Sequence, residues 1–266
     1  MEVTINDFKV ANFNTFLEKA NIGEHHHGIV ITPEKTYVRA TNSSKSMVKY
    51  SAIKTSMVAS SIDFVESPII KIPLLALKKV IAALNVYKAK KIESLTVSME
   101  GEKFDDELIV REIKFKHRSA KVTVPCVEPT LVQFLTDQNW SKFVDDNNSI
   151  IKVDFKDTDK KALGSLLDMV IANTSDKAKQ VMLASSPEAL SLSDPKGKYF
   201  SYNLEENVEQ VDTKEIGLAF SDRVLALLDA PLYRMEVKLF SKDLGAVIFH
   251  ENEGNVVAAP ISRVAD

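Results

Sequence analysis

The sequence predicts an α+β protein of two similar domains, each with two helices packed on antiparallel sheets. The predicted elements of the first half follow the order strand, helix, several strands, helix, several strands, and the second half repeats this order with little sequence identity. The predicted strands are short, alternate apolar with polar residues, and are separated by turn residues, as in antiparallel sheets with one buried face. A chain of 266 residues is long enough for two domains of ordinary size.

The first predicted domain, residues 1–125, contains two amphipathic helices. The earlier one covers residues 12–21, and Asn12 is a suitable N-cap because its side chain can accept a hydrogen bond from a free backbone N–H. The later one lies within residues 71–91, where Pro73 suits the first turn because its missing N–H needs no partner there. Apolar residues of this segment recur at helical spacing, at Leu74, Leu77, Ile81 and Leu84. Strands are predicted at residues 3–8, 28–32, 35–41, 46–53, 69–72, 94–101, 108–115 and 121–124.

Residues 126–149 predict a connector, because they combine proline, an Asp/Asn-rich end and scattered large apolar residues, and we expect it to lie on a surface. The second domain, residues 150–266, has a predicted helix that opens at Asp157 or Thr158. A further helix is capped by Ser221 and stopped by Pro231. Strands are predicted here at residues 150–155, 180–184, 189–193, 199–204, 215–220, 233–240, 246–249 and 256–261.

Composition excludes several classes of protein. No apolar run approaches the roughly 20 residues of a membrane helix, and no signal-peptide pattern is present, so we expect no membrane partner and an intracellular location, cytoplasmic or nuclear according to the host. The single cysteine, Cys126, rules out an internal disulfide and a cysteine-based zinc site. No glycine-rich phosphate loop and no nucleophile elbow occur, so we predict no cofactor and no catalytic residue.

The segment of residues 71–91 is unusually basic. It contains six lysines and no acidic residue, in a chain whose formal net charge is −3. A helix here would bury one face and present cations on the other, which indicates a polyanion bound on one chosen surface. The alternative is an ordinary solvated helix with a lysine-rich face.

Five short segments resemble one known family. They are Ala230-Pro231-Leu232, Ser241-Lys242-Asp243-Leu244-Gly245, Ala259-Pro260-Ile261, the T-N-S-S-K-S-M-V run of residues 41–48, and Arg111-Glu112-Ile113-Lys114-Phe115. With the order of elements over nearly the whole length, they resemble the trimeric DNA sliding clamps of the proliferating cell nuclear antigen family. The connector looks longer than the family's, and residues 194–209 are divergent, which suits a viral or phage member better than a cellular one.

The resemblance implies a clamp ring that forms on trimerisation, with three two-domain subunits joined head to tail and helices facing a central hole. It implies a non-enzymatic processivity factor that encircles double-stranded DNA independently of sequence and tethers DNA polymerase and other replication proteins after a clamp loader has opened it. Ring closure would pair the free sheet edges of neighbouring subunits. The expected interface residues are Ile109, Arg111, Ile113, Phe115, Phe200, Tyr202 and Leu204. The alternative is that these are ordinary edge strands shielded by their charges.

Duplex DNA sliding through a ring calls for phosphate contacts without base readout. The basic residues expected to supply them lie on or just beyond the predicted helices: Lys19, Lys78, Lys79, Lys88, Lys90, Lys91, Lys160, Lys161, Lys177, Lys179 and Arg223.

The resemblance also implies a pocket for a short partner peptide beneath the connector. Its expected members are Met47, Leu131, Pro231, Ala259, Pro260 and Ile261, some of which could instead be plain core. Two alternative functions stay open. One is a monomeric or dimeric factor of the same fold that grips DNA by charge. The other is a metal-dependent hydrolase using His25, His26 and His27, although three consecutive side chains converge poorly on one metal and a solvated loop is expected.

Overall fold

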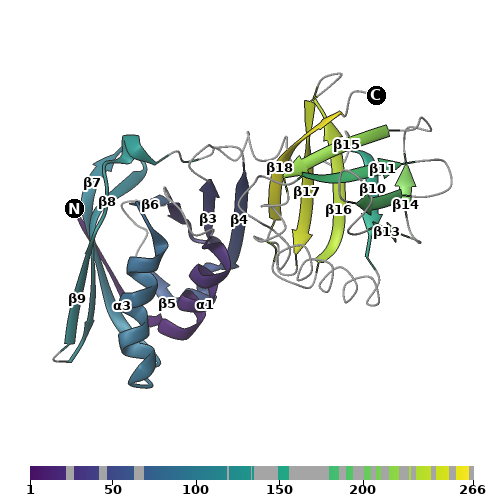
Figure 1. The fold of residues 1–266 in the computed structure, drawn as a ribbon. Helices are drawn as coiled ribbons and strands as arrows, with labels where there is room; N and C mark the ends of the chain where they lie inside the picture. Colours follow the sequence, from purple (N-terminus) through teal and green to yellow (C-terminus); the bar gives the residue numbers. More distant parts are fainter. Residues whose placement is uncertain are drawn as a thin grey trace. The chain divides into compact units, whose positions relative to one another are not determined.

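The computed structural model describes residues 1–21, 27–41, 47–62, 69–118, 120–132, 134, 149–155, 180–185, 190–193, 201–204, 208–210, 216–221, 228, 232–240, 244–251 and 256–263. The chain divides into two compact units, Met1–Leu135 and Thr136–Asp266. The division falls inside the stretch predicted as a connector. Strands dominate both units (Figure 1), so the predicted α+β class is confirmed, with sheet as its larger part.

The first unit is a bent sheet with helices on one side. Its sheet runs β5–β1–β7–β8–β9, and β8 also pairs in parallel with β6, which continues as β6–β2–β3–β4. Its elements are β1 Glu2–Lys9, α1 Val10–Ala20, β2 His27–Ile31, β3 Lys35–Thr41, β4 Val48–Lys54, α2 Thr55–Val58, β5 Ala59–Ile62, β6 Ile69–Leu74, α3 Leu77–Ala89, β7 Ser94–Phe104, β8 Glu107–His117, β9 Ala120–Pro125 and the short 3-10 helix η1 Pro129–Leu131.

Helices α1 and α3 pack against each other and cover the core of this unit. Aromatic rings hold α1 to the sheet, because Phe8 lies edge-on to Phe13 at 4.9 Å and to Phe115 at 6.3 Å between ring centroids. Pairs of this geometry contribute about 0.5–1.5 kcal/mol beyond their buried area. On α3, the buried side chains recur at helical spacing, at Leu77, Val80, Ala83, Leu84 and Tyr87.

The start of α1 differs from the prediction. The helix begins at Val10 and not at Asn12, because β1 leads into it directly: Val10 is buried and its N–H donates to the carbonyl of Glu93 at 3.1 Å. The side chain of Asn12 instead donates to the carbonyl of Met57 at 2.7 Å. A tertiary contact therefore replaces the predicted cap.

The start of α3 also differs. Pro73 and Leu74 belong to β6, and the helix begins three residues later, at Leu77. Ile72 and its neighbours pair with β2, and Pro73 lies beyond the short stretch of β6 that pairs with β8. A proline is tolerated there because no N–H is needed on that side, and its carbonyl accepts a hydrogen bond from the N–H of Val127 at 3.0 Å.

The second unit contains one antiparallel sheet in the order β14–β10–β16–β17–β18–β15–β11–β12–β13. The order within each half repeats that of the first unit, with β14–β10–β16–β17–β18 matching β5–β1–β7–β8–β9 and β15–β11–β12–β13 matching β6–β2–β3–β4. The halves are joined differently, because β15 pairs antiparallel with β18 whereas β6 pairs in parallel with β8. Its strands are β10 Ser149–Asp154, β11 Gln180–Ser185, β12 Leu190–Ser193, β13 Ser201–Leu204, β14 Val208–Gln210, β15 Ile216–Ser221, β16 Leu232–Leu239, β17 Leu244–Glu251 and β18 Val256–Arg263. Ser221 ends β15, and the two helices predicted for this domain fall outside the described residues.

The start of the predicted connector lies on the first unit. Backbone N–H groups of Cys126 and Val127 donate to Arg111 and Pro73 carbonyls at 2.8 and 3.0 Å. Further along, Val132 is buried, and the ring of Phe134 lies 2.8 Å from the position of a Cβ at Gly28. Only glycine leaves room there for the aromatic ring, so the connector and β2 fit each other closely.

Candidate nucleic-acid interface

The side of α1 and α3 that faces away from the core exposes polar side chains together with Val86. The two helices are joined by the amide of Asn14, a buried residue, which donates to the side chain of Asn85 at 3.3 Å and to that of Glu18 at 2.7 Å. Beyond this link, α3 exposes lysines at both of its ends, Lys78 and Lys79 in the first turn and Lys88 in the last. Cations near a helix C-terminus are favoured by the helix dipole.

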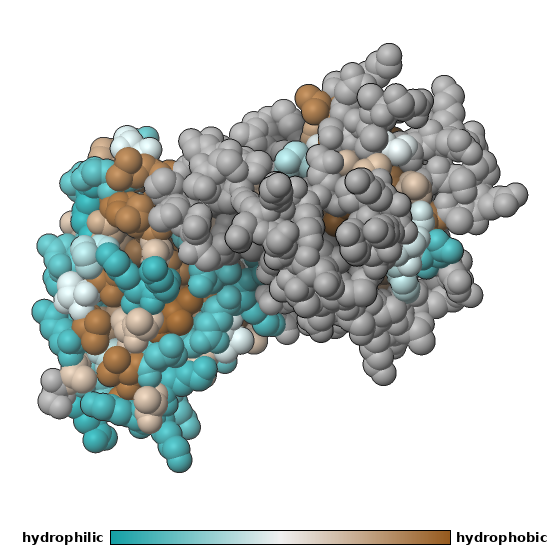
Figure 2. All heavy atoms as spheres, in the orientation of Figure 1, coloured by the Kyte–Doolittle hydropathy of each residue, from teal (hydrophilic) through white to brown (hydrophobic). Residues whose placement is uncertain are grey.

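The predicted DNA-binding residues of the first unit lie at the two ends of α3, just past its end, and in the last turn of α1. Lys78, Lys79 and Lys88 are exposed on α3, Lys90 and Lys91 are exposed just past its end, and Lys19 is half-buried in the last turn of α1. Figure 2 shows hydrophilic residues over much of the visible face of the first unit, including its lower end, where α3 ends in Figure 1. The remaining predicted residues lie outside the described part of the chain: Lys160, Lys161, Lys177, Lys179 and Arg223.

Three cations on the sheet, Lys71, Arg111 and Lys114, are in contrast paired with carboxylates. Lys114 contacts Glu100 at 2.6 Å and Glu112 at 2.8 Å, and these hydrogen bonds raise the pKa of the Lys114 ammonium. Lys71 pairs with Glu107 at 2.6 Å. Within the described residues, no carboxylate pairs with the exposed lysines of α3. Among the described residues, the lysines of α3 therefore lack the carboxylate partners that Lys71 and Lys114 have on the sheet.

The predicted subunit-interface strand of residues 109–115 is not an edge. It belongs to β8, which β7 pairs on one side and β9 on the other, and Ile113 and Phe115 are buried in the core. Arg118, with φ 46°, lies in the tight turn after β8. This turn reverses the chain, so that β9 pairs with the edge of β8 that was predicted to be free. Among the described strands, β9 pairs with β8 alone and β13 with β12 alone, so both are free edges, as are β5 and β14.

Of the other predicted interface residues, Ile109 and Arg111 are half-buried in β8, Tyr202 is half-buried in β13, Leu204 ends β13, and Phe200 lies outside the described residues. The sequence held the missing signal, because residues 121–124 alternate and follow a short turn, so a hairpin with β8 was the natural pairing.

The predicted peptide-pocket residues differ in exposure. Leu131 in η1 is 55% exposed, and Pro260 in β18 is exposed. Met47, Ala259 and Ile261 are buried, the last two in β18 beside β17. Pro231 lies outside the described residues.

The histidine run does not form a described metal site. His27 is buried as the first residue of β2, opposite Ala40 and Leu74, and not in the solvated loop that the sequence suggested. His25 and His26 lie outside the described residues. Across the described ranges, no group of three histidine, cysteine or acidic side chains could hold a metal ion, and no helix is long and apolar enough to span a membrane.

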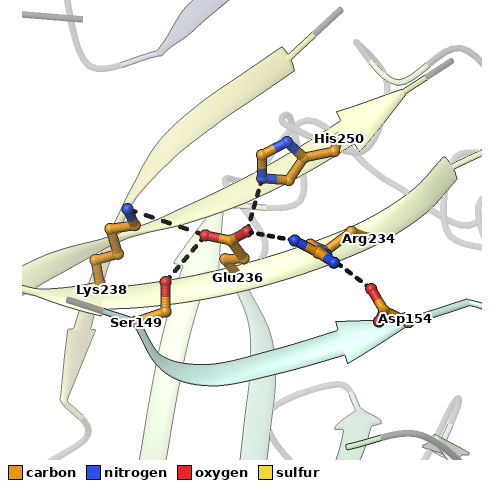
Figure 3. A network of polar contacts seen from close by, with 6 residues as sticks. All are labelled: Ser149, Asp154, Arg234, Glu236, Lys238 and His250. Atoms are coloured by element: carbon orange, nitrogen blue, oxygen red, sulfur yellow. Dashed lines mark hydrogen bonds and ion pairs between the residues drawn. The ribbon is translucent and has the colours of Figure 1, made fainter. Parts of the chain in front are cut away.

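A buried polar network in the second unit went unpredicted (Figure 3). The Glu236 carboxylate, fully buried in β16, accepts a hydrogen bond from the Ser149 hydroxyl at 2.9 Å and lies 3.2 Å from His250 Nε2. The buried Lys238 ammonium lies 3.9 Å from it, and Arg234 lies 3.7 Å from it while donating to Asp154 at 2.7 Å.

Opposing effects set the charge of this network. Burial by itself raises the pKa of Glu236, but His250, the Ser149 hydroxyl and Lys238 together outweigh it and lower the pKa from 4.5 to about 2. Glu236 is therefore a carboxylate at neutral pH. Glu236 and Lys238 are two residues apart on β16, so alternation alone would have predicted them on a solvated face.

The two repeated units and their strand order define the fold of the DNA sliding clamps. No protein-family model and no curated protein sequence matches the chain. Among solved structures, a Helicobacter pylori beta clamp bound to a DNA ligase peptide matches with a TM-score of 0.62 at 13% identity, over 98% of this chain and 66% of that chain. The chain thus spans just under two thirds of the length of that beta clamp.

Two archaeal structures match over almost their full length. The PCNA2–PCNA3 complex of Sulfolobus tokodaii matches with a TM-score of 0.55 at 10% identity, over 100% of both chains. The A. fulgidus PCNA bound to the C-terminal region of FEN-1 matches with a TM-score of 0.57 at 13% identity, over 99% of both chains. At these identities the likeness establishes the fold.

Proposed function

We propose that this protein is a DNA sliding clamp, a polymerase processivity factor that encircles duplex DNA. The observation that supports this most is the division of charge in the first unit. On the sheet, Lys71 and Lys114 are neutralised by carboxylates, whereas α3 presents Lys78, Lys79 and Lys88 without described carboxylate partners. Unpaired lysines on a helical layer suit the phosphate backbone of DNA, which gives affinity without sequence readout.

The mechanism is topological tethering. A closed ring loses DNA only by opening, so weak phosphate contacts are sufficient and the protein can slide. The clamp itself catalyses nothing and needs no cofactor in this proposal. It acts inside the cell, and its divergence from the family suits a viral or phage origin.

We infer that the ring is a head-to-tail trimer formed by β9 of one subunit and β13 of the next. Both are free edges among the described strands, and each presents unpaired backbone groups that a neighbour can bond. Lys121 is exposed on β9, and in the sequence Glu205 and Glu206 directly follow β13. Opposite charges at the two edges would favour this pairing over pairing of like edges.

Partner proteins would dock through short peptides. A DNA ligase peptide is bound to the Helicobacter pylori clamp and the C-terminal region of FEN-1 to the A. fulgidus PCNA. By analogy, we propose that DNA polymerase and other replication proteins dock on this clamp, with exposed Leu131 of η1 among the apolar contacts. A clamp loader would open the ring onto DNA.

Light scattering over a range of protein concentrations tests the assembly. We expect a mass near three times 29.6 kDa, and a fall toward the monomer mass in Lys121→Asp/Thr123→Asp, which places negative charge on the β9 edge. A matched control is Thr15→Asp/Lys78→Asp on the exposed sides of α1 and α3, which changes the charge by the same amount and should stay trimeric. A monomer at every concentration would contradict the ring and favour an open factor that grips DNA by charge.

A further inference from the structure

A second group of cations lies at the end of the first unit where α3 ends. It comes from the β8–β9 hairpin, where Lys116 lies opposite Lys121 in the backbone register and Arg118 occupies the turn. The Tyr87 hydroxyl donates to the carbonyl of Phe115 at 2.8 Å, which fixes the last turn of α3 against β8 next to this hairpin. Figure 1 shows the end of α3 and the β8–β9 turn at the same end of the unit.

The turn that follows α3 directs its lysines to this same end. The N–H of Ile92 donates to the carbonyl of Tyr87 at 3.1 Å, so the chain of Lys90 and Lys91 folds back over the helix terminus before β7 begins. Two parts of the chain that are distant in sequence thus form one basic end surface, which we define as Lys88, Lys90, Lys91, Lys116, His117, Arg118 and Lys121.

The charge of the basic end surface is uncompensated within the described residues. Along β8, Lys114 is the last cation to be paired with carboxylates. Two residues further along β8, the Lys116 ammonium donates to the neutral Ser98 hydroxyl at 3.4 Å. Arg118 has no described carboxylate partner, and Glu93 is the one acidic residue in the turn after α3. Clustered like charges repel one another, so this arrangement is favourable only when an anion lies near it.

We propose that the β8–β9 hairpin is an additional phosphate-binding element that extends the contact surface of α3 along DNA. The proposal rests on the proposed function, since the DNA would be the duplex that α3 faces. From Lys79 to Lys90 the helix advances about 17 Å at about 1.5 Å per residue, a length over which a duplex carries about ten negative charges. The basic end surface includes Lys88 of α3, and the same helix carries Lys78 and Lys79 at its other end. Cations spread over this length favour nucleic acid over a separate acidic protein partner.

Fluorescence anisotropy with a short labelled duplex tests the element in the full-length protein. The test variant is Arg118→Glu, at the β8–β9 turn. The matched control is Lys103→Glu, because Lys103 is exposed in β7 beside the β7–β8 turn, at the opposite end of β8, and the change in charge is the same. These positions are separated by most of the length of β8, about 35 Å for 11 residues.

The expected result is weaker binding for Arg118→Glu alone. The slope of log affinity against log salt should be less steep by about 0.9 for each phosphate that the variant no longer neutralises. The ratio of the wild-type affinity to the affinity of Arg118→Glu should therefore fall about threefold between about 50 and about 200 mM salt, for one lost phosphate contact.

Two outcomes would overturn the proposal. Equal weakening in both variants is one, because net charge alone would then explain it. The other is unchanged binding in Arg118→Glu with weakened binding in Lys78→Glu/Lys79→Glu, which would leave the proposed function intact. If the wild-type protein fails to bind the duplex, the proposed function fails first.

Discussion

Replacing Glu236 by glutamine should destabilise the second unit strongly and in a pH-dependent way. The substitution keeps the size of the side chain and the bond from the Ser149 hydroxyl, but removes the negative charge that lies between Lys238 and His250. The pKa of Glu236 falls from 4.5 to about 2 on folding. At about 1.4 kcal/mol for each pKa unit, this shift corresponds to roughly 3 kcal/mol of stability at neutral pH.

The sign of the pH dependence follows from the direction of the shift. Because the folded-state pKa is the lower one, the stabilisation is complete above pH 4.5 and is lost as the pH falls toward 2. The glutamine variant lacks this dependence. The free energies of unfolding of the two proteins should therefore differ most above pH 4.5 and converge below it.

Urea unfolding followed by circular dichroism, at pH values from neutral to acidic, measures the difference. Glu112→Gln is the control, because Glu112 belongs to a half-exposed ion pair with Lys114 and should cost less than about 1 kcal/mol. Equal effects of the two substitutions, or a Glu236→Gln difference that stays constant with pH, would refute the reasoning.

Three further substitutions test the packing of the first unit. Tyr87→Phe removes the buried hydroxyl that bonds the Phe115 carbonyl and should cost about 1–3 kcal/mol in urea unfolding; an unchanged midpoint would contradict the role of this bond. Leu84→Ala leaves a cavity beneath α3 and should cost about 2–5 kcal/mol, whereas a cost below about 1 kcal/mol would mean that α3 does not cover the core as described. Gly28→Ala places a Cβ 2.8 Å from the ring of Phe134, so it should displace the start of the connector and speed limited proteolysis there; a wild-type cleavage rate would show that the ring is not held on β2.

Alternation made most strands predictable from sequence. Leu95, Val97 and Met99 are buried in β7 as their period-two spacing indicated, and every strand predicted in the second half has a counterpart. The predicted start of α3 was wrong because Pro73 and Leu74 fit a helix and a strand equally well. Proline is common in the first turn of a helix, and leucine occurs both at the alternating spacing of strands and at helical spacing. The pairing of Leu74 with His27 of β2, a long-range contact, decided between them.

The candidate site was predictable only in part. The lysines of α3 could be predicted as a candidate DNA-binding group because the run of residues 71–91 contains no acidic residue. Whether a lysine has a carboxylate partner could not be predicted, because this depends on which strands lie next to it. Lys114 and Lys116 illustrate this, since they are two residues apart on β8 and the structure pairs only the former with glutamates. Likewise, Glu236 and Lys238 became buried because Ser149 and His250 arrive from other strands. Which strand formed the sheet edge also depended on β9 covering β8, a tertiary pairing.

The most direct test of the proposed clamp is topological. Thr123 on β9 and Asn203 on β13 are both exposed, so each can be replaced by cysteine and joined across neighbouring subunits with a flexible bismaleimide in the presence of nicked circular DNA. The account predicts covalent rings that stay on the circles in high salt and detergent and are released when the circle is cut once. Cross-linked protein that leaves circular and linear DNA at the same rate would contradict it.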